Sequence, residues 1–269
     1  MTASHTVQRV RHDTRLRMLS VLRTRHITPK MLRVTLGGSE LQGFVSAAAD
    51  DHVKLFLPER PGGAPVLPAG RPGATPAVDA PVPIARDYTP RRYDAANQEL
   101  DIEFSLHGDG PAAKWASQAR PGHQLAIGGP RGSFVVSNDF DWYLLIGDDT
   151  ALPAIGRRLS ELPVGARALV IAEVDDRSEE QLFQCNADLQ VRWLHRDGAA
   201  AGDAGRLQAA VSALKLPSGT GYSWIACEAN VARSLRQQLL AEKSLDRQWL
   251  KAAGYWKRGS SATHEKFED

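Results

Sequence analysis

The sequence changes its pattern once, near Asp139, and this change restricts the fold more than any other feature. Before it, short apolar runs are separated by turn residues such as Gly37-Gly38 and Pro121-Gly122. We expect strands at residues 18–22, 31–36, 52–57, 99–106 and 124–127. Several short strands with turn signals between them predict an antiparallel β-barrel.

After Asp139, short apolar runs alternate with stretches of helical periodicity. We expect strands at residues 142–146, 168–173, 189–194 and 222–227, and helices near 151–162, 204–214 and 230–242. This alternation indicates βαβ units and a parallel sheet, whose ligands bind beyond the carboxyl ends of the strands. The predicted class is therefore β + α/β, with a β-barrel domain over residues 1–137 and an α/β domain over residues 138–269.

Composition narrows the class of protein. A chain of 269 residues fits two domains. Its two cysteines, Cys185 and Cys227, form neither a disulfide framework nor a zinc-binding spacing, which fits a reducing cytoplasm. No apolar stretch suits a signal peptide or a membrane span. Residues 1–33 are basic but lack interleaved aromatic residues, so we do not expect the protein to bind nucleic acid. We expect a monomer in the cytoplasm.

The segment Arg86–Arg92 has the chemistry to bind a flavin dinucleotide. Arg86 offers a planar guanidinium for a phosphate. Tyr88 offers a flat ring for stacking, and Thr89 offers a hydroxyl and a backbone N–H. The alternative interpretation is a charged turn that leads into the strand at 99–106. Residues 58–83, rich in Pro, Gly and Ala, are expected to form an irregular insertion.

A second anion site is expected where Gly110 opens a short helix near residues 108–119. The unpaired N–H groups at a helix start suit a diphosphate, and the small side chains of Ala112 and Ala113 permit close approach. Lys114 follows in the first turn. Trp115 packs either on an adenine ring or on the barrel, and the sequence leaves both open.

These motifs, taken in order, resemble the siderophore-interacting protein family. The resemblance also rests on Gly128–Ser133, on the Leu144–Ile155 segment and on Gly254–Gly259, and it runs roughly from His12 to Gly259. This family consists of flavin-dependent ferric-siderophore reductases within the ferredoxin-reductase superfamily. It implies FAD in the barrel domain and NADPH or NADH in the α/β domain. Electrons would pass to the Fe(III) of a ferric siderophore, which is released as Fe(II).

The resemblance also assigns roles to residues. Arg86 would meet the diphosphate, Tyr88 the ring system and Thr89 the reactive nitrogen, with His107 beside the cofactor. With the α/β-domain positions, the expected cofactor-binding residues are Arg86, Asp87, Tyr88, Thr89, His107, Gly110, Ala112, Ala113, Lys114, Trp115, Gly147, Asp149, Thr150, Glu228 and Trp256. No catalytic side chain and no metal ligand is expected, because the flavin carries the electrons.

A basic rim is implied for the anionic substrate. Lys54 interrupts an apolar strand, and Arg131 lies in a Pro-Arg-Gly turn. Arg247 and Lys251 are further candidates for this rim, near the C-terminus.

The electron donor stays open at the sequence level. The turn at Gly147–Thr150 is poor in glycine, and its Asp148 and Asp149 stand where a diphosphate would be repelled. Thr150 is expected to cap the following helix. Acids at 173–176 suit NADH, whereas Arg177 suits NADPH. The alternatives are a ferredoxin-linked reductase and a flavin- or siderophore-binding protein without nicotinamide-driven turnover.

Overall fold

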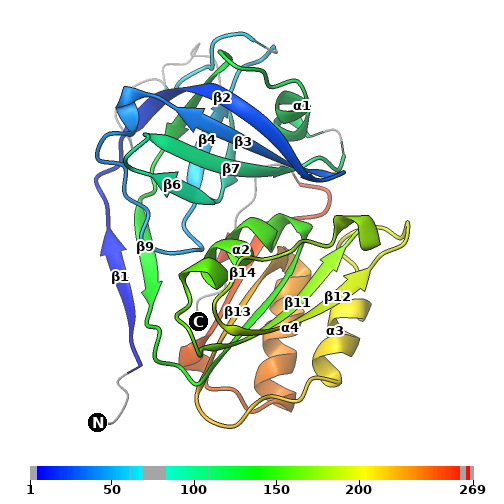
Figure 1. Ribbon diagram of the computed structural model, residues 1–269. Helices are drawn as coiled ribbons and strands as arrows, with labels where there is room; N and C mark the ends of the chain where they lie inside the picture. The colour runs from blue at the N-terminus through cyan, green and yellow to red at the C-terminus, as the bar shows by residue number, and fades with distance from the viewer. Residues whose placement is uncertain (1–4, 61, 69–82, 109, 261–264, 267–269) are drawn as a thin grey trace. The chain divides into compact units, whose positions relative to one another are not determined.

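The computed structural model describes residues 5–60, 62–68, 83–108, 110–260 and 265–266. Much of the expected insertion at 58–83, and Asp109 of the helix-opening motif, lie outside these residues. The chain forms two compact units (Figure 1). One comprises Gln8–Val135, and the rest of the described chain belongs to the other.

The first unit is built on a seven-stranded sheet with the order β5-β4-β8-β2-β3-β7-β6, in which every neighbouring pair is antiparallel. Its strands are β2 (Leu16–Thr28), β3 (Met31–Gly37), β4 (Val53–Leu57), β5 (Ile84–Tyr88), β6 (Arg92–Asp94), β7 (Glu99–Ser105) and β8 (Gln124–Gly128). A 3-10 turn, η1 (Ser39–Leu41), and one helix, α1 (Pro111–Ser117), accompany the sheet. Strands β1 (Val7–Arg11) and β9 (Gly132–Val136) pair with each other in a separate ribbon.

The two edges of this sheet are joined by the segment Arg86–Arg92, which carries the predicted flavin-binding motif. Strand β5 ends at Tyr88 and β6 begins at Arg92, four Cα steps later, which span at most about 14 Å. The sheet must therefore curl until its edges approach. The expected antiparallel barrel is confirmed as a curled sheet whose ladder runs from β5 to β6, with a seam at residues 89–91. Edge strands at such a seam present backbone N–H and C=O groups to a ligand.

Strand alternation fills the barrel core. Leu32, Val34 and Leu36 of β3 and the facing residues of β7 are almost fully buried in one cluster, and Trp115 of α1 joins them. Residues of the opposite parity, such as Thr35 and Asp101, carry the polar groups of β3 and β7. This alternation of two explains why the sequence predicts these strands well.

The second unit has the expected parallel sheet. Its order is β12-β11-β10-β13-β14-β15, and only β15 runs antiparallel to its neighbour. The strands are β10 (Trp142–Asp148), β11 (Arg167–Val174), β12 (Asp188–His195), β13 (Gly221–Glu228), β14 (Leu250–Trp256) and β15 (Glu265–Lys266). The helices are α2 (Leu152–Glu161), α3 (Gly205–Ser212) and α4 (Ala229–Glu242), with 3-10 turns η2 (Asp149–Ala151), η3 (Arg177–Glu179) and η4 (Arg247–Trp249).

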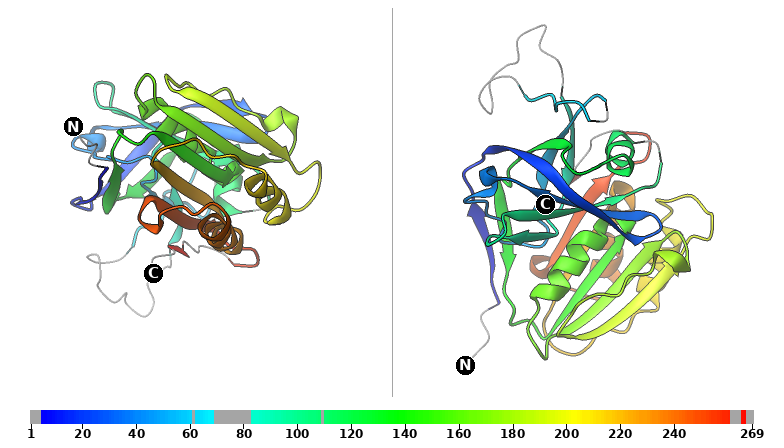
Figure 2. Two further views of the ribbon diagram at one scale, coloured as in Figure 1. Left: turned by 90° about the horizontal axis from the view of Figure 1, so that it is seen from below. Right: turned by 45° about the horizontal axis from the view of Figure 1, so that its top comes forward.

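Helix α2 covers one face of this sheet, and α3 and α4 cover the other (Figures 1 and 2). Apolar residues of β10, such as Leu144 and Ile146, pack with Val211 of α3 and Leu235 of α4. The strand order places the first turn of the unit, after β10, at the middle of the sheet, where the connections diverge to either side. Ligands of open parallel sheets bind at this point. No helix among the described residues is long and apolar enough to cross a membrane.

Candidate functional site

The motif at the barrel seam presents a guanidinium and a ring together. Arg86 and Tyr88 lie on β5 opposite Leu55 and Val53, whereas Asp87 is opposite Lys54. Strand alternation therefore places Arg86 and Tyr88 on one face and Asp87 on the other. The Tyr88 ring lies 4.5 Å from that of Phe104, and burial raises the pKa of Tyr88 above its usual range.

Arg86 remains half-buried at this seam. Its Nη1 donates to the backbone oxygen of Ala85 at 2.8 Å, which leaves other N–H groups of the guanidinium for an anion. Thr89 follows directly and is buried. The carboxyl end of β5 thus brings Arg86, Tyr88 and Thr89 together.

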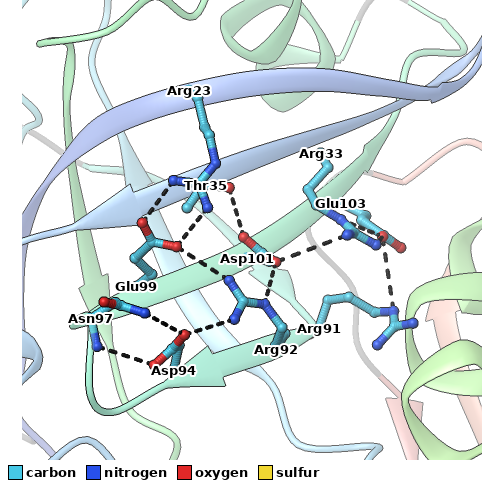
Figure 3. A network of polar contacts seen from close by, with 10 residues as sticks. All are labelled: Arg23, Arg33, Thr35, Arg91, Arg92, Asp94, Asn97, Glu99, Asp101 and Glu103. Carbon is cyan, nitrogen blue, oxygen red and sulfur yellow. Dashed lines mark hydrogen bonds and ion pairs between the residues drawn. The ribbon is translucent and has the colours of Figure 1, made fainter. Parts of the chain in front are cut away.

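The other arginines of the motif are used by the protein itself. Arg92 Nε donates to Asp101 at 2.8 Å, and Arg91 lies 3.8 Å from Glu103. Asp101 also accepts from Thr35 at 2.7 Å. Figure 3 shows this network on β2, β3, β6 and β7 and the loop residues beside β6; its residues are Arg23, Arg33, Thr35, Arg91, Arg92, Asp94, Asn97, Glu99, Asp101 and Glu103. Arg86 is therefore the arginine of the motif that stays outside the network.

Helix α1 divides the second predicted anion site into exposed and buried parts. Gly110 and Lys114 are exposed, whereas Ala112 and Ala113 are buried. Trp115 is only 4% exposed, and its ring lies 5.6 Å from Phe104, so it packs on the barrel core. The ring therefore occupies the barrel-packing position that the sequence left open, and a contact of Trp115 with the cofactor stays a prediction.

His107, at the end of β7, is half-buried and lies within 2.7 Å of a neighbouring hydroxyl, Nδ1 to Ser105 Oγ. Trp115 Nε1 is buried without a hydrogen-bond partner in the described part of the chain. A polar ligand atom at this place would satisfy a donor that the fold leaves unpaired.

The predicted rim residues of the first unit are arranged unequally. Lys54 Nζ lies 2.8 Å from Asp87 Oδ1 in a cross-strand ion pair. Arg131 is exposed, and no ion-pair partner for it occurs among residues 5–60, 62–68, 83–108, 110–260 and 265–266. Lys54 is in register with Gly128, three positions before Arg131, so both cations belong to one region of this unit.

The other two rim candidates lie in the second unit. Arg247 is in η4 and Lys251 is in β14 in register with Trp224, at the amino end of the parallel strands. Trp256 ends the same strand five residues after Lys251, about 16 Å along it. Within this unit, Arg247 and Lys251 are therefore separated from the carboxyl edge where a nicotinamide coenzyme would bind.

The turn after β10 is buried, and its first carboxylate is hydrogen-bonded within the second unit. Asp148 Oδ1 accepts from the backbone nitrogen of Thr150 at 3.0 Å, and Oδ2 accepts from Trp256 Nε1 at 2.7 Å. Asp148 thus caps η2, whereas the N-cap of α2 is Ala151 without a side-chain hydrogen bond, so the expectation that Thr150 caps the following helix is wrong. Burial and the neighbouring Asp149 raise the pKa of Asp148 to about 6.

The next acids share a buried arginine. Arg196 Nη1 lies 3.6 Å from Asp149 and 3.7 Å from Glu173, and its side chain is 4% exposed. Arg206 approaches the second oxygen of Glu173 at 3.9 Å. Burial raises the pKa of Glu173 to about 7 against the pull of Arg196. The sequence assigns Arg196 no role; its signal is its place directly after a strand end, in the stretch 195–197 where ligands of a parallel sheet are expected.

Glu228 and Cys227 are likewise engaged at this edge. Glu228 Oε2 accepts from the backbone nitrogens of Asn230 and Val231 and caps α4, while Oε1 accepts from the backbone nitrogen of Arg258 at 3.2 Å. Cys227 is 1% exposed, and burial raises the pKa of its thiol. Both side chains are buried within the second unit. Gly147 permits close packing of the turn, because an added Cβ there would lie 2.7 Å from the Ala226 oxygen.

Comparison with known proteins agrees with these two halves. Residues 20–134 match the siderophore-interacting FAD-binding domain, and residues 140–259 match the siderophore-interacting protein domain. The chain belongs to the siderophore-interacting protein family. The expected family is thereby confirmed.

The family includes relatives of similar length. The NADPH-dependent ferric-chelate reductase of Escherichia coli (strain K12) is 36% identical over 93% of this chain and 96% of its own. The ferric vibriobactin reductase of Vibrio cholerae serotype O1 is 34% identical over 93% of each chain. The crystal structure of a siderophore utilization protein from T. fusca superposes with a TM-score of 0.87 at 39% identity, over 97% of this chain and 98% of the other.

More distant structures share the fold alone. A ferredoxin reductase of carbazole 1,9a-dioxygenase superposes with a TM-score of 0.63 at 16% identity, over 88% of this chain and 68% of the other. The predicted class, an antiparallel curled sheet followed by a parallel sheet with helices, is confirmed by this likeness.

Proposed function

We propose that this protein is an FAD-dependent reductase that uses NADPH to reduce the Fe(III) of ferric siderophores. The observation that carries the proposal is the full-length similarity to the E. coli ferric-chelate reductase, together with the FAD-binding domain over residues 20–134. Bound FAD would take two electrons from one NADPH and pass them singly to two Fe(III) ions.

The residues at the seam fit FAD. Arg86 offers charge-assisted donors to the diphosphate, and the exposed Gly110 at the start of α1 offers backbone N–H groups. Tyr88 supplies a flat wall and Thr89 a backbone donor. His107 would lie beside the cofactor and Lys114 would add positive charge. We assign these positions, with Ala112 and Ala113 as the small residues that admit the backbone, to the FAD site.

The carboxyl edge of the parallel sheet is the proposed coenzyme site. Asp148 and Asp149 are buried and partnered, so neither presents a free carboxylate to a diphosphate. This arrangement supports NADPH over ferredoxin as the proposed donor. Trp256, held by Asp148, and Gly147 with Thr150 would shape this site. Arg177 is exposed in η3, at the end of β11 where a 2′-phosphate would be read.

Arg131 and Lys54 would line the substrate side of the first unit, and the substrate-binding roles of Arg247 and Lys251 stay predictions. A ferric siderophore with exposed carboxylate or catecholate groups would be attracted by such cations. The cytoplasmic location and the monomeric state stay predictions.

Anaerobic mixing tests the donor. We expect flavin bleaching by NADPH, followed by Fe(II) capture by a coloured chelator when a ferric siderophore is added. Bleaching by reduced ferredoxin alone would replace NADPH with ferredoxin as donor, and no bleaching by any donor would indicate a binding protein.

The flavin site is tested by Arg86→Ala, which should lower the flavin content of the purified protein. Arg25→Ala, an exposed arginine of β2 in the same unit, is the matched control and should keep the flavin. Chromatography of heat-released cofactor should give FAD. Recovery of FMN only, or equal flavin loss in both variants, would contradict the assignment.

A further inference from the structure

We propose that Asp87 sets the charge selectivity of the substrate site by masking Lys54. This inference rests on the proposed function, because it takes Lys54 and Arg131 as part of the surface that meets the ferric complex. Its physical basis is the ion pair between Lys54 Nζ and Asp87 Oδ1 at 2.8 Å, formed by directly opposed residues of β4 and β5.

The pair is stable in position but open to exchange. Cross-strand register holds the two Cα atoms opposite each other, so the side chains meet without reordering of the backbone. The Lys54 side chain is 43% exposed and that of Asp87 is 23% exposed. Ion pairs with this exposure contribute little to stability, so an incoming anion can compete with Asp87 for the ammonium group.

Arg131 provides the contrast within the same region. It is exposed and has no ion-pair partner in the described residues, while Lys54 is in register with Gly128 on the strand that leads to it. The formal charge of Lys54, Asp87 and Arg131 together is therefore one positive charge instead of two. Asp87 thus reduces the attraction for a strongly anionic complex and has little effect on an electroneutral one.

Asp87 acts on the substrate side and not on the flavin. It lies on the face of β5 opposite to Arg86 and Tyr88, as the pairing with Lys54 shows. Its carboxylate points to Lys54 on that face, so a cofactor contact at this position would be made through backbone atoms. Asp87→Asn should consequently leave the flavin content and the rate of flavin reduction by NADPH unchanged.

The test compares Asp87→Asn with Glu59→Gln, which removes the same charge from an exposed residue beyond the other end of β4. Each variant is given ferric citrate as the anionic substrate and an electroneutral ferric tris-hydroxamate. For Asp87→Asn we expect KM for ferric citrate to fall roughly three- to tenfold at low ionic strength, with kcat nearly constant. The tris-hydroxamate should change by less than about twofold, and added salt should reduce the difference.

The pathway through Lys54 is tested by repeating Asp87→Asn in a Lys54→Met background, where its effect on ferric citrate should largely disappear. An undiminished effect in that background would mean that Asp87 repels the complex directly, and it would overturn the masking proposal. Equal changes for both substrates, a rise in KM for ferric citrate, or loss of flavin would also overturn it.

A binding measurement separates this inference from the proposed function. Quenching of intrinsic fluorescence by each ferric complex gives a dissociation constant without turnover. If the wild-type protein reduces no ferric complex with NADPH, the proposed function fails. The masking proposal then still stands or falls on whether Asp87→Asn tightens binding of the anionic complex alone.

Discussion

Glu173 gives a sharp test of the electrostatics at the carboxyl edge of the parallel sheet. The carboxyl is 1% exposed, and its Oε2 has no hydrogen-bond partner among the described residues. Its nearest cations, on Arg196 and Arg206, lie at 3.7 and 3.9 Å, beyond hydrogen-bond distance. We expect Glu173→Gln to stabilise the second unit at pH 8, because it removes a charge whose desolvation is incompletely compensated.

The magnitude follows from the pKa. Burial raises the pKa of Glu173 from 4.5 to about 7, so the folded state binds its proton more tightly than the unfolded state does. The contribution of this group to the free energy of unfolding is therefore fully present below pH 4.5 and is lost as the pH rises to 7. At about 1.4 kcal/mol per pKa unit the loss reaches at most about 3 kcal/mol. Asp148, raised from 3.8 to about 6, adds a loss of the same sign at lower pH.

Intrinsic fluorescence reports this unit selectively, because five tryptophans, Trp142, Trp193, Trp224, Trp249 and Trp256, lie in it and only Trp115 lies in the other. Urea unfolding between pH 4.5 and 8 should show stability falling with pH in the wild-type protein and a flatter profile in Glu173→Gln. Glu161→Gln, at the exposed end of an i,i+4 pair with the largely buried Arg157, should change stability by less than about 1 kcal/mol. A loss of stability at pH 8 in Glu173→Gln would show that the ionised carboxylate is net stabilising, and the reasoning would be refuted.

Two further changes test single contacts in each unit. Trp256→Phe removes the donor to Asp148 Oδ2 and should cost about 1–3 kcal/mol at pH 8, where the carboxylate is ionised and left with an unsatisfied oxygen; urea unfolding against the wild type measures it. Asp101→Asn removes the charge that Arg92 and Thr35 share in the network of Figure 3 and should cost about 2–4 kcal/mol; hydrogen exchange of the β3 and β7 amides should accelerate, and unchanged protection there would contradict a stabilising network.

The fold was largely predictable because both units follow the two simple periods of secondary structure. The strands at 31–36 and 99–106 and the helix at 230–242 occur where alternation and helical spacing placed them. Short elements were missed for a physical reason. Strand β5 carries Arg86 and Asp87 on an edge, so its polar residues read as a turn. Strand β14 was missed because Ala and Gly dominate its centre.

The candidate site was predictable in its residue types and less so in their partners. The sequence correctly placed acids at the ends of β10 and β11, but it predicted that Asp148 and Asp149 would repel a diphosphate. In the structure, Asp148 accepts a hydrogen bond from the indole N–H of Trp256 in β14, and Asp149 lies close to the guanidinium of Arg196 at the end of β12. These donors are distant in sequence, and no local pattern connects them to the turn.

The same limit explains why charge alone is a weak guide to the substrate side. Lys54 and Arg131 look alike in the sequence, as lone cations in otherwise apolar or glycine-rich surroundings. The fold distinguishes them, because strand register sets Asp87 opposite Lys54, whereas Arg131 lies in the turn between β8 and β9 and has no ion-pair partner in the described part of the chain. Since register depends on pairing between strands far apart in the chain, an effective charge at a binding surface is a property of the fold. The comparison of anionic with electroneutral complexes therefore tests whether the pairing of β4 with β5, which sets Asp87 opposite Lys54, determines the charge at this surface.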